Sequence, residues 1–355
     1  MFQATPQLSI DDFLTAPGPI LDVRSPGEYA QGHIPGAISL PLFSNDERAQ
    51  VGTCYKQRGR EQAVELGLDL TGPKLGEMVR KAKAIAPDDK VLRIHCWRGG
   101  MRSGAVASML TLCGFQTATL TGGYKSFRQW VRHTVATPKP IILLGGMTGT
   151  AKTDILHALS AQGEQMLDLE SYANHRGSSY GAVCLPPQPS TEQFENLIAT
   201  EWYSFDSQRP IWIEAESRSV GSCRVPPELF AQMNAAFALE ITRPLSERLA
   251  LLADIYGQAD RNELIEATER IRKRLGGKRT QQAVDYIKAG DLVRAIAITL
   301  TYYDRTYRYG LEQRDRPVPE VDVTGLSPQQ AAQRLCHTFV KLLKTEAKQT
   351  LLSSL

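Results

Sequence analysis

The sequence predicts an α/β protein with two domains, each built on a parallel sheet, and a helical C-terminal region. A chain of 355 residues is too long for one compact core. Short apolar runs alternate with segments of helical periodicity, which is the pattern of a parallel sheet covered by helices on both faces. Two glycine-rich loops, at residues 96–103 and 146–153, each follow an apolar run. Because ligands bind at the carboxyl ends of parallel strands, we expect one site in each domain.

Composition narrows the class of protein. Hydrophobic residues make up 42% and charged residues 22% of the chain, as in ordinary globular proteins. The net charge is only +3, so a nucleic-acid surface would have to be a local patch. We see no secretory signal and no apolar run of membrane-spanning length, and we expect no membrane partner. Six cysteines without paired spacing argue against a disulfide framework or a zinc site and favour a cytoplasmic location.

The first domain is predicted to span residues 1–138. "GPILDVRS" predicts a short buried strand over 20–23, and "PGEYAQGHIPGAISLP" predicts a helical turn and a second strand over 37–40. "DDKVLRIHC" predicts a strand over 90–95 that places Cys96 at its carboxyl end, and "RSGAVASMLTLCGF" predicts the helix that follows. "TATLTGGYKSFRQW" adds a strand, a glycine turn and a further helix.

The loop "CWRGGMRS" has the properties of an anion site built around a sulfur atom. Gly99 and Gly100 allow successive backbone N–H groups to point inward, and the following helix directs its positive end to the same space. With Arg98 and Arg102 nearby, Cys96 is expected to be a reactive thiolate. These two arginines and the cysteine are the candidate catalytic residues. A buried, inert cysteine is the alternative.

Two families share this arrangement. "IHCWRGGMRSG" fits the tyrosine-phosphatase pattern of His-Cys, five residues, then Arg-Ser, and it also resembles a rhodanese active-site loop, whose cysteine carries sulfur or selenium. "DVRSPGEYAQGHIPGAISLP" resembles the N-terminal rhodanese signature, which those phosphatases lack, so the first domain is expected to be rhodanese-like. Rhodanese loops usually place four residues between cysteine and arginine, but five separate Cys96 from Arg102. We therefore expect a wider loop that accepts a phosphate-sized anion.

The second domain is predicted to be a P-loop NTPase-like α/β domain over residues 139–242. "IILLGGMTGTAKTDILHAL" gives a strand over 141–144, a Walker A loop and a helix, with Ala151 in place of the usual last glycine. Backbone N–H groups of such a loop cradle phosphates, its lysine neutralises them and its threonine can hold Mg²⁺. The Cβ of Ala151 restricts φ, so diphosphate binding is expected more than nucleotide turnover. The candidate diphosphate-binding residues are Gly146, Thr148, Gly149, Thr150, Lys152 and Thr153.

Acidic and basic residues beyond the P-loop extend the list of candidates. "MLDLE" and "IWIEAES" end in acids, so Asp168 and Glu214 either act at the second site or are ordinary strand-end acids. "HRGSSYG", over 175–181, is either a loop lining a site or a solvated one.

From 243 to 355 helical periodicity predominates, which predicts a helical C-terminal region of the P-loop domain. Six basic residues within 270–279 form either an RNA contact or a solvated helix end: Arg270, Arg272, Lys273, Arg274, Lys278 and Arg279.

The order of "CWRGGMRS", "GGMTGTAKT", "LDLESYANHRGSSYG" and "IEAESRSVG" resembles the tRNA 2-selenouridine synthase family over essentially the whole chain. The resemblance implies a reaction at the wobble uridine (U34) of tRNA, in which 2-thiouridine is S-geranylated by geranyl diphosphate and selenium from selenophosphate then replaces the geranylthio group. It also implies that Cys96 carries selenium transfer and that the loop around Lys152 holds the diphosphate. Ala151 departs from the glycine of that family.

The same resemblance implies the partners. These are the anticodon loop of tRNA with its wobble 2-thiouridine, and an enzyme that supplies selenophosphate. No tightly bound cofactor is expected, although Mg²⁺ could bind through Thr153. Because one nucleotide must reach two loops, the tRNA is expected to move between the domains.

Several alternatives stay open at the level of sequence. Selenium passes either through a selenyl-cysteine on Cys96 or by direct attack of the bound donor, with Arg98 and Arg102 stabilising phosphate charge. A rhodanese-fold phosphatase or a persulfide carrier fused to a P-loop kinase or ATPase would carry the same motifs. A tRNA-binding protein without activity is the non-enzymatic alternative.

Overall fold

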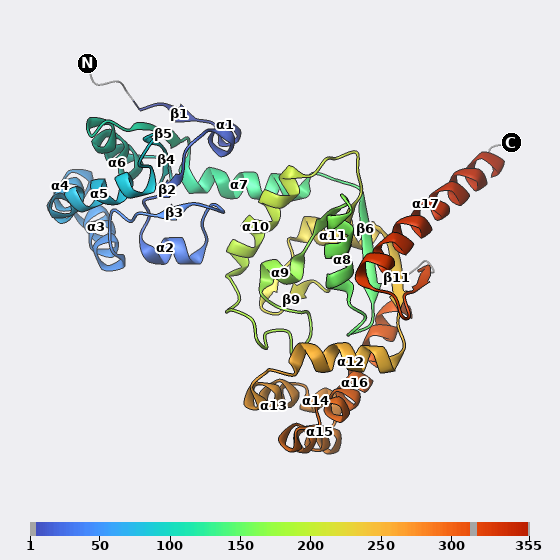
Figure 1. Ribbon diagram of the computed structural model, residues 1–355. Helices are drawn as coiled ribbons and strands as arrows, with labels where there is room; N and C mark the ends of the chain where they lie inside the picture. Colours follow the sequence, from blue (N-terminus) through green and yellow to red (C-terminus); the bar gives the residue numbers. More distant parts are fainter. Residues whose placement is uncertain (1–4, 313–317, 354–355) are drawn as a thin grey trace. The chain divides into compact units, whose positions relative to one another are not determined.

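The computed structural model describes residues 5–312 and 318–353. Its contacts divide the chain into two compact units. Unit 1 comprises Met1–Thr134 together with Glu195–Thr200, and unit 2 comprises Val135–Phe194 and Glu201–Leu355. Both units are α/β structures with parallel sheets, so the predicted fold class is confirmed (Figure 1).

Unit 1 contains a five-stranded sheet in the order β1-β5-β4-β2-β3, and every neighbouring pair is parallel. β4 lies in the middle of this sheet, and three of its five residues, Leu92, Ile94 and His95, are buried. The strands are β1 (Gln7–Leu8), β2 (Ile20–Asp22), β3 (Ile38–Ser39), β4 (Val91–His95) and β5 (Gln116–Leu120).

Seven α-helices and one short 3₁₀ helix accompany this sheet in the described part of unit 1. They are α1 (Ile10–Thr15), α2 (Pro26–Gln31), α3 (Asn45–Arg58), α4 (Arg60–Thr71), η1 (Gly72–Lys74), α5 (Leu75–Ile85), α6 (Met101–Leu112) and α7 (Gly123–Ala136). The helices α3 to α5 were not predicted from the sequence. α3 in particular buries none of its residues, so it has no apolar stripe by which periodicity could reveal it.

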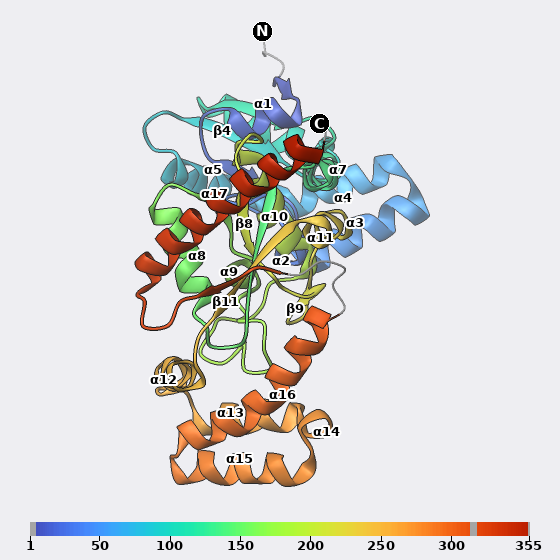
Figure 2. The same cartoon turned by 90° about the vertical axis from the view of Figure 1, so that its right-hand side faces the viewer.

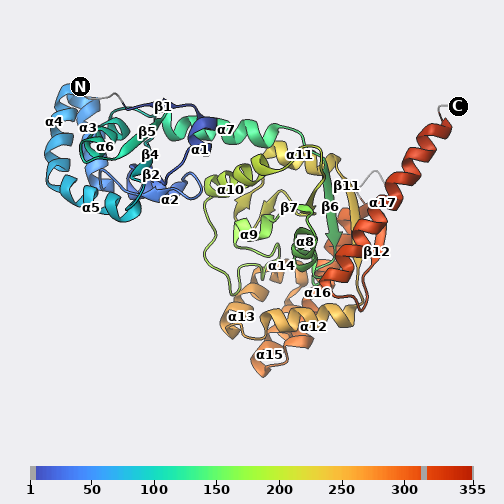
Figure 3. The same cartoon turned by 45° about the horizontal axis from the view of Figure 1, so that its top comes forward.

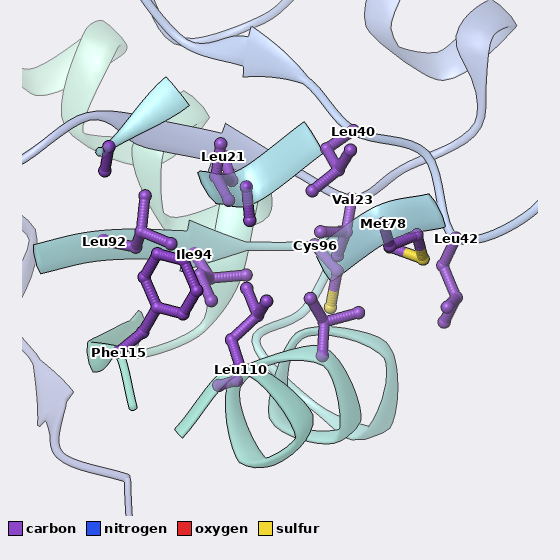
Figure 4. Close-up of a cluster of buried hydrophobic side chains, with 14 of the residues drawn as sticks. Leu21, Val23, Leu40, Leu42, Met78, Leu92, Ile94, Cys96, Leu110 and Phe115 are labelled. Atoms are coloured by element: carbon purple, nitrogen blue, oxygen red, sulfur yellow. The ribbon is translucent and has the colours of Figure 1, made fainter. Parts of the chain in front are cut away.

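The core of unit 1 reaches the carboxyl end of β4. Figure 4 shows Cys96 among the apolar side chains that pack between the sheet and α6, including Val23, Ile94 and Leu110. A cysteine inside this cluster is shielded from water, whereas the loop that follows it is largely exposed. The core therefore fixes the sulfur atom while the loop stays accessible to a ligand.

Unit 2 contains a second five-stranded parallel sheet, in the order β12-β11-β6-β8-β7. β6 is the central strand, and all six of its residues are buried. The strands are β6 (Ile141–Gly146), β7 (Gln165–Leu167), β8 (Ile211–Glu214), β11 (Phe237–Thr242) and β12 (Glu320–Asp322), while β9 (Ser219–Val220) and β10 (Cys223–Arg224) form a separate antiparallel pair.

Helices of unit 2 form two groups. α8 and α17 cover one face of the sheet, where they share an apolar core with β6, β8 and β11. A second group, α12 to α16, lies together beyond the end of the sheet (Figures 2 and 3). The helices are α8 (Lys152–Ala161), α9 (Leu169–Ala173), α10 (Thr191–Ser204), α11 (Pro227–Ala235), α12 (Leu245–Tyr256), α13 (Arg261–Arg270), α14 (Arg272–Leu275), α15 (Gly277–Ala289), α16 (Leu292–Glu312) and α17 (Pro328–Ser353).

The C-terminal region is helical as predicted, with one addition. β12 returns to the sheet and pairs in parallel with β11, with Val321 opposite Ile241. This strand has only three residues, of which the middle one is buried, so its periodicity is too short to detect. In the described part of the chain, no helix combines the length and the apolar character needed to cross a membrane.

Candidate functional site

The cysteine loop of unit 1 is anchored at its start. Cys96 directly follows β4, and its side chain is almost fully buried, with 3% of the residue exposed. Its carbonyl oxygen accepts a hydrogen bond of 2.8 Å from the N–H of Tyr124, and the Trp97 carbonyl accepts one of 2.9 Å from Lys125. The first turn of α7 therefore holds the start of the loop in place.

Glycine is required where this loop meets the turn before α7. Gly99 has φ +64°, and a Cβ atom at this position would lie 2.3 Å from the carbonyl oxygen of Leu120. Gly123, with φ +61°, is equally confined, because its Cβ would lie 2.4 Å from the Cys96 carbonyl oxygen. Any side chain at either position would push the two backbones apart.

The surroundings of Cys96 favour its ionised form. Burial alone raises the pKa of the thiol, but hydrogen bonds from the Ser103 hydroxyl and from the N–H groups of Ser103 and Gly100, together with the charge of Arg102, outweigh it and lower the pKa. Sγ lies 3.3 Å from Ser103 Oγ. These donors belong to the end of the loop and the first turn of α6, the two features on which the expected thiolate of Cys96 depends.

The two candidate arginines of unit 1 differ in their surroundings. Arg102 is partly buried, and its Nη1 lies 2.8 Å from Oε2 of Glu28, while Arg48 approaches the same carboxylate at 3.9 Å. Arg98, in contrast, has an exposed side chain. Arg102 is thus held in a fixed position beside the cysteine loop, and Arg98 can turn toward a ligand.

His95 is uncharged at neutral pH. It is fully buried, and burial lowers its pKa to about 4, although the carboxylate of Asp22 at 3.6 Å acts in the opposite direction. Asp22 is itself bound to Arg24 at 2.6 Å. The buried group formed by His95, Asp22 and Arg24 therefore links the ends of β2 and β4.

The second loop connects β6 to α8 in the manner of a P-loop. Gly149 has φ +84°, and a Cβ there would lie 2.9 Å from Leu252. The hydroxyl of Thr150 donates to the Met147 carbonyl at 2.8 Å, and the Lys152 ammonium donates to the Gly146 carbonyl at 2.9 Å. Strand, loop and helix thus occur where the sequence predicts them.

Ala151 takes the conformation that glycine has in such loops. Its φ is +65° and its ψ is 36°, which is the left-handed region. A residue with a Cβ is strained there by roughly 1–2 kcal/mol. The alanine at this position is therefore expected to cost stability.

Helices α12 and α16 brace the same loop. Arg248 of α12 donates from Nε to the Thr148 carbonyl at 2.8 Å, and its Nη2 forms a 2.5 Å ion pair with Asp304 of α16. Arg248 is 3% exposed, so this interaction is shielded from water. The sequence pattern gave no indication of this arginine, because the contact joins residues 100 positions apart.

A chain of acids extends from the P-loop into the sheet. Thr153 donates from its hydroxyl to Oε2 of Glu170 at 2.9 Å, and the N–H of Glu170 donates to Oε1 of Glu214 at 2.8 Å. Burial, followed by the charge of Glu216, raises the pKa of Glu170 to about 7. Burial and the neighbouring carboxylates raise the pKa of Glu214 well above its usual value. Glu170 was not selected from the sequence, although it ends the quoted "MLDLE" run.

Asp168 lies near this group in a different role. Its side chain caps α9 by accepting from the Ser171 N–H at 2.8 Å, and its Oδ2 lies 2.9 Å from Nε2 of His157. The loop "HRGSSYG" adjoins the acids, since a Cβ at Gly177 would lie 2.6 Å from Oε1 of Glu216. This loop therefore borders the acidic group.

The oxygen atoms beside the P-loop suit a partly hydrated Mg²⁺ bound to phosphate. Among the described residues, no group of three or more histidine, cysteine and acidic side chains has the geometry of a complete metal site. Mg²⁺ needs only one or two protein oxygens when phosphates supply others. Thr153 and Glu170 are placed to provide them, and Glu214 Oε2 is buried with no hydrogen-bond partner among the residues described.

The six basic residues of 270–279 are all exposed. They lie on α13, α14 and the start of α15, within the helical group of unit 2 (Figure 2). Three of them have local partners: Arg272 pairs with Glu269, Arg270 donates to the Ser179 carbonyl at 2.8 Å, and Arg274 donates to the Tyr302 hydroxyl at 3.1 Å. These six exposed residues, which lie close together in the sequence, are called the basic patch below.

The fold and the two loops define a protein that combines an α/β unit carrying a cysteine loop with an α/β unit carrying a P-loop. The rhodanese-like domain family matches residues 8–129, and the tRNA 2-selenouridine synthase AAA domain family matches residues 139–325. The chain therefore belongs to the tRNA 2-selenouridine synthase family, a family of enzymes that modify tRNA.

Solved structures match parts of the chain. The N-terminal domain of a protein from Clostridium difficile 630 is 39% identical, with 35% of this chain and 98% of that chain covered and a TM-score of 0.34. A protein from Bacillus halodurans is 21% identical over 35% and 72% of the two chains, with a TM-score of 0.21. The tRNA isopentenylpyrophosphate transferase of Bacillus halodurans is 11% identical over 60% and 99%, with a TM-score of 0.34.

Proposed function

We propose that this protein converts 2-thiouridine to 2-selenouridine at the wobble position of tRNA through an S-geranylated intermediate. The observation that carries the proposal is the presence of two different anion sites in one chain of this family. One is a cysteine loop with a lowered thiol pKa, and the other is a P-loop strengthened by Arg248. Geranyl diphosphate and selenophosphate, the two proposed co-substrates, each need such a site.

The first step is proposed to take place at the P-loop. The sulfur of 2-thiouridine attacks C1 of geranyl diphosphate, the C–O bond breaks, and pyrophosphate leaves with the electron pair while N3 of the base loses its proton. Backbone N–H groups of the loop and Lys152 stabilise the charge that develops on pyrophosphate. Mg²⁺ held by Thr153 and Glu170 would supply further positive charge to the phosphates. No nucleotide hydrolysis is needed.

The second step is proposed to begin with direct attack by selenium. The selenium atom of selenophosphate adds to C2, and the alkylated sulfur leaves as geranylthiolate, which leaves a phosphoryl group on selenium. A selenyl-cysteine on Cys96 is the other route. It would require phosphorus to depart as phosphite or an oxidant to be present, because selenophosphate selenium is already fully reduced. Direct attack by selenium needs neither the departure of phosphite nor an oxidant, and we favour this route.

Cys96 is then proposed to release the phosphoryl group. Its thiolate attacks phosphorus, the P–Se bond breaks with its electrons on selenium, and water hydrolyses the resulting S-phosphocysteine to orthophosphate. Arg102 and Arg98 bind the phosphoryl oxygens. This role explains why the loop has the five-residue spacing of phosphatases inside a rhodanese-like unit. It also accounts for the phosphatase alternative without a separate substrate.

The proposed partners of the protein are tRNA and an enzyme that makes selenophosphate, and its proposed location is the cytoplasm. We infer that the basic patch contacts the tRNA backbone, because clustered exposed arginine and lysine residues attract phosphates. An enzyme that makes selenophosphate is the proposed supplier of that co-substrate. The six cysteines described in the structure are all unpaired, which supports a reducing, cytoplasmic location.

Mass spectrometry of the wobble nucleoside tests this function. A 2-thiouridine tRNA would be treated with geranyl diphosphate and then with selenophosphate, using the wild type and the variants Cys96→Ser and Lys152→Ala. We expect Lys152→Ala to lose most geranylation but to act on pregeranylated tRNA. We expect Cys96→Ser to geranylate normally and to accumulate the selenium-phosphorylated nucleoside.

The outcomes distinguish the two routes of selenium transfer, and they also test the proposed function itself. If Cys96→Ser accumulates the geranylated nucleoside instead, selenium passes through the cysteine. If the wild type leaves 2-thiouridine unchanged, the proposed function is wrong. Turnover of p-nitrophenyl phosphate without any tRNA product would then favour the phosphatase alternative.

A further inference from the structure

An apolar cavity lies within the helical group of unit 2, beside the P-loop. The space is small, since only about 20 Å³ is free for the centre of a water-sized sphere, so side chains must move apart before a ligand can enter. Its lining comes mostly from α12 and α16, with contributions from α13 and α15, and includes Leu252, Leu264, Ile287, Ile296 and Leu300. Pockets for small ligands are usually lined in this way, by apolar side chains with few polar groups.

The tyrosines in the lining add to its apolar character. The hydroxyl of Tyr303 accepts from the Ser179 N–H at 3.0 Å, that of Tyr180 lies 2.6 Å from Thr268 Oγ1, and that of Tyr256 bonds to the Ser178 side chain. Their hydroxyl groups are thus already bonded to protein, and the rings line the space. Aromatic faces also stabilise a nearby positive charge.

The cavity meets the P-loop at Thr148, which belongs to both. Gly149, the next residue, lies against Leu252, a residue of the cavity wall; a Cβ on it would come within 2.9 Å of Cδ1. Arg248, one turn before Leu252 on α12, holds the Thr148 carbonyl. A phosphate site and an apolar space therefore share one wall, which is the arrangement needed for a ligand with a charged head and a hydrocarbon tail.

We propose that this cavity is the binding site for the prenyl tail of an allylic diphosphate whose head occupies the P-loop. The inference rests on the proposed geranylation, and it adds where the tail binds and which residues select its length. As the C–O bond breaks, allylic carbon gains positive charge, and the aromatic rings of the lining would stabilise it. Because the free space is small, the prenyl tail must push side chains of α12 and α16 apart as it enters.

Direct binding to the full-length protein tests the assignment. Calorimetric titrations would compare inorganic pyrophosphate with dimethylallyl, geranyl and farnesyl diphosphates. Each buried carbon strengthens binding by about fourfold, so geranyl diphosphate should bind on the order of 10²–10³ times more tightly than the five-carbon compound. Ala295→Phe, in the lining, should remove most of this gain without changing the affinity for pyrophosphate. Ala297→Phe, on the same helix but outside the lining, is the matched control.

A second variant covers the case in which Ala295→Phe does not fold. Leu300→Ala enlarges the cavity, and it should shift the preference from geranyl toward farnesyl diphosphate by about tenfold or more, which a purely structural role would not do. Equal affinity of the wild type for pyrophosphate and geranyl diphosphate, or equal effects of both alanine-to-phenylalanine variants, would overturn the inference and leave the P-loop function intact. If no diphosphate binds and Lys152→Ala changes nothing, the proposed geranylation fails instead.

Discussion

Arg102 Nη1 lies 2.8 Å from Oε2 of Glu28, and this ion pair joins the first turn of α6 to the first turn of α2. Glu28 is itself fixed, because the same carboxylate accepts a 3.0 Å hydrogen bond from the Ser25 N–H in a capping box. Burial raises the pKa of Glu28, but Arg102 outweighs this and lowers it. The carboxylate is therefore ionised at neutral pH and holds the guanidinium beside the cysteine loop.

Replacing Glu28 by glutamine should weaken the use of selenophosphate. The variant keeps the cap but loses the charged partner of Arg102, so the arginine is less well positioned for phosphate. We expect KM for selenophosphate to rise about tenfold, which corresponds to roughly 1.4 kcal/mol, with geranylation unchanged. Steady-state kinetics of each half-reaction would measure this.

A matched control is Glu47→Gln. Glu47 forms the same capping box on α3 and pairs with Lys74. If both variants raise KM equally, or if Glu28→Gln slows geranylation as well, the effect reflects the stability of unit 1 and not the position of Arg102.

Replacing Ala151 by glycine should stabilise unit 2. Relief of the left-handed strain should raise the free energy of unfolding by about 1–2 kcal/mol. The greater conformational freedom of glycine in the unfolded chain should lower it by about 0.4–1 kcal/mol. The expected net gain is roughly 0.5–1 kcal/mol, measured by denaturant unfolding. Ala158→Gly, in the middle of α8, is the contrasting control and should destabilise. Equal losses in both variants would contradict the strained conformation of Ala151.

The effect of Glu214→Gln should depend on pH. Because the folded-state pKa of Glu214 is raised, the folded protein retains a proton that the unfolded chain releases near pH 4.5. The contribution of Glu214 to the free energy of unfolding is therefore greatest at low pH. It falls by about 1.4 kcal/mol per pH unit as the pH rises, until the folded-state pKa of Glu214 is reached. Glutamine has no such loss and can still accept the Glu170 N–H.

Thermal unfolding at pH 5 and pH 8 measures this difference. The melting temperature of Glu214→Gln should exceed that of the wild type by more at pH 8 than at pH 5. Glu65→Gln, at an exposed position, should differ from the wild type in melting temperature by the same small amount at both pH values. A difference for Glu214→Gln that does not grow with pH would mean that the carboxyl group is ionised in the folded protein.

The sequence was informative where local pattern determines structure. Apolar residues located the strands that carry Cys96 and the P-loop, because inner strands of a parallel sheet are largely buried. The glycines of both loops were recognised for the backbone conformations they provide. Ala151 is the instructive exception. The residue type restricts φ, and in the structure Ala151 nevertheless takes a left-handed backbone conformation, which glycine adopts without strain.

Contacts between distant residues could not be predicted in this way. Glu28 and Arg102 are 74 positions apart, and Arg248 and the Thr148 carbonyl are 100 apart. Their pairing depends on how the helices are placed around the sheet, which periodicity does not specify. Glu170 was missed for a related reason, because its position after the strand places it on α9 and only the fold brings it to Thr153.

The basic patch should govern the salt dependence of tRNA binding. If its exposed side chains neutralise phosphates, removing three of them lowers the number of counterions released on binding. The triple variant Lys273→Ala, Lys278→Ala and Arg279→Ala should reduce the slope of log K against log salt concentration by about 2–3. Filter binding at several salt concentrations measures the slope. The control removes Arg80, Lys81 and Lys83, three exposed basic residues of α5. Since both variants change net charge equally, an equal reduction in slope would assign the effect to overall charge, and an unchanged slope in the first would place the tRNA elsewhere.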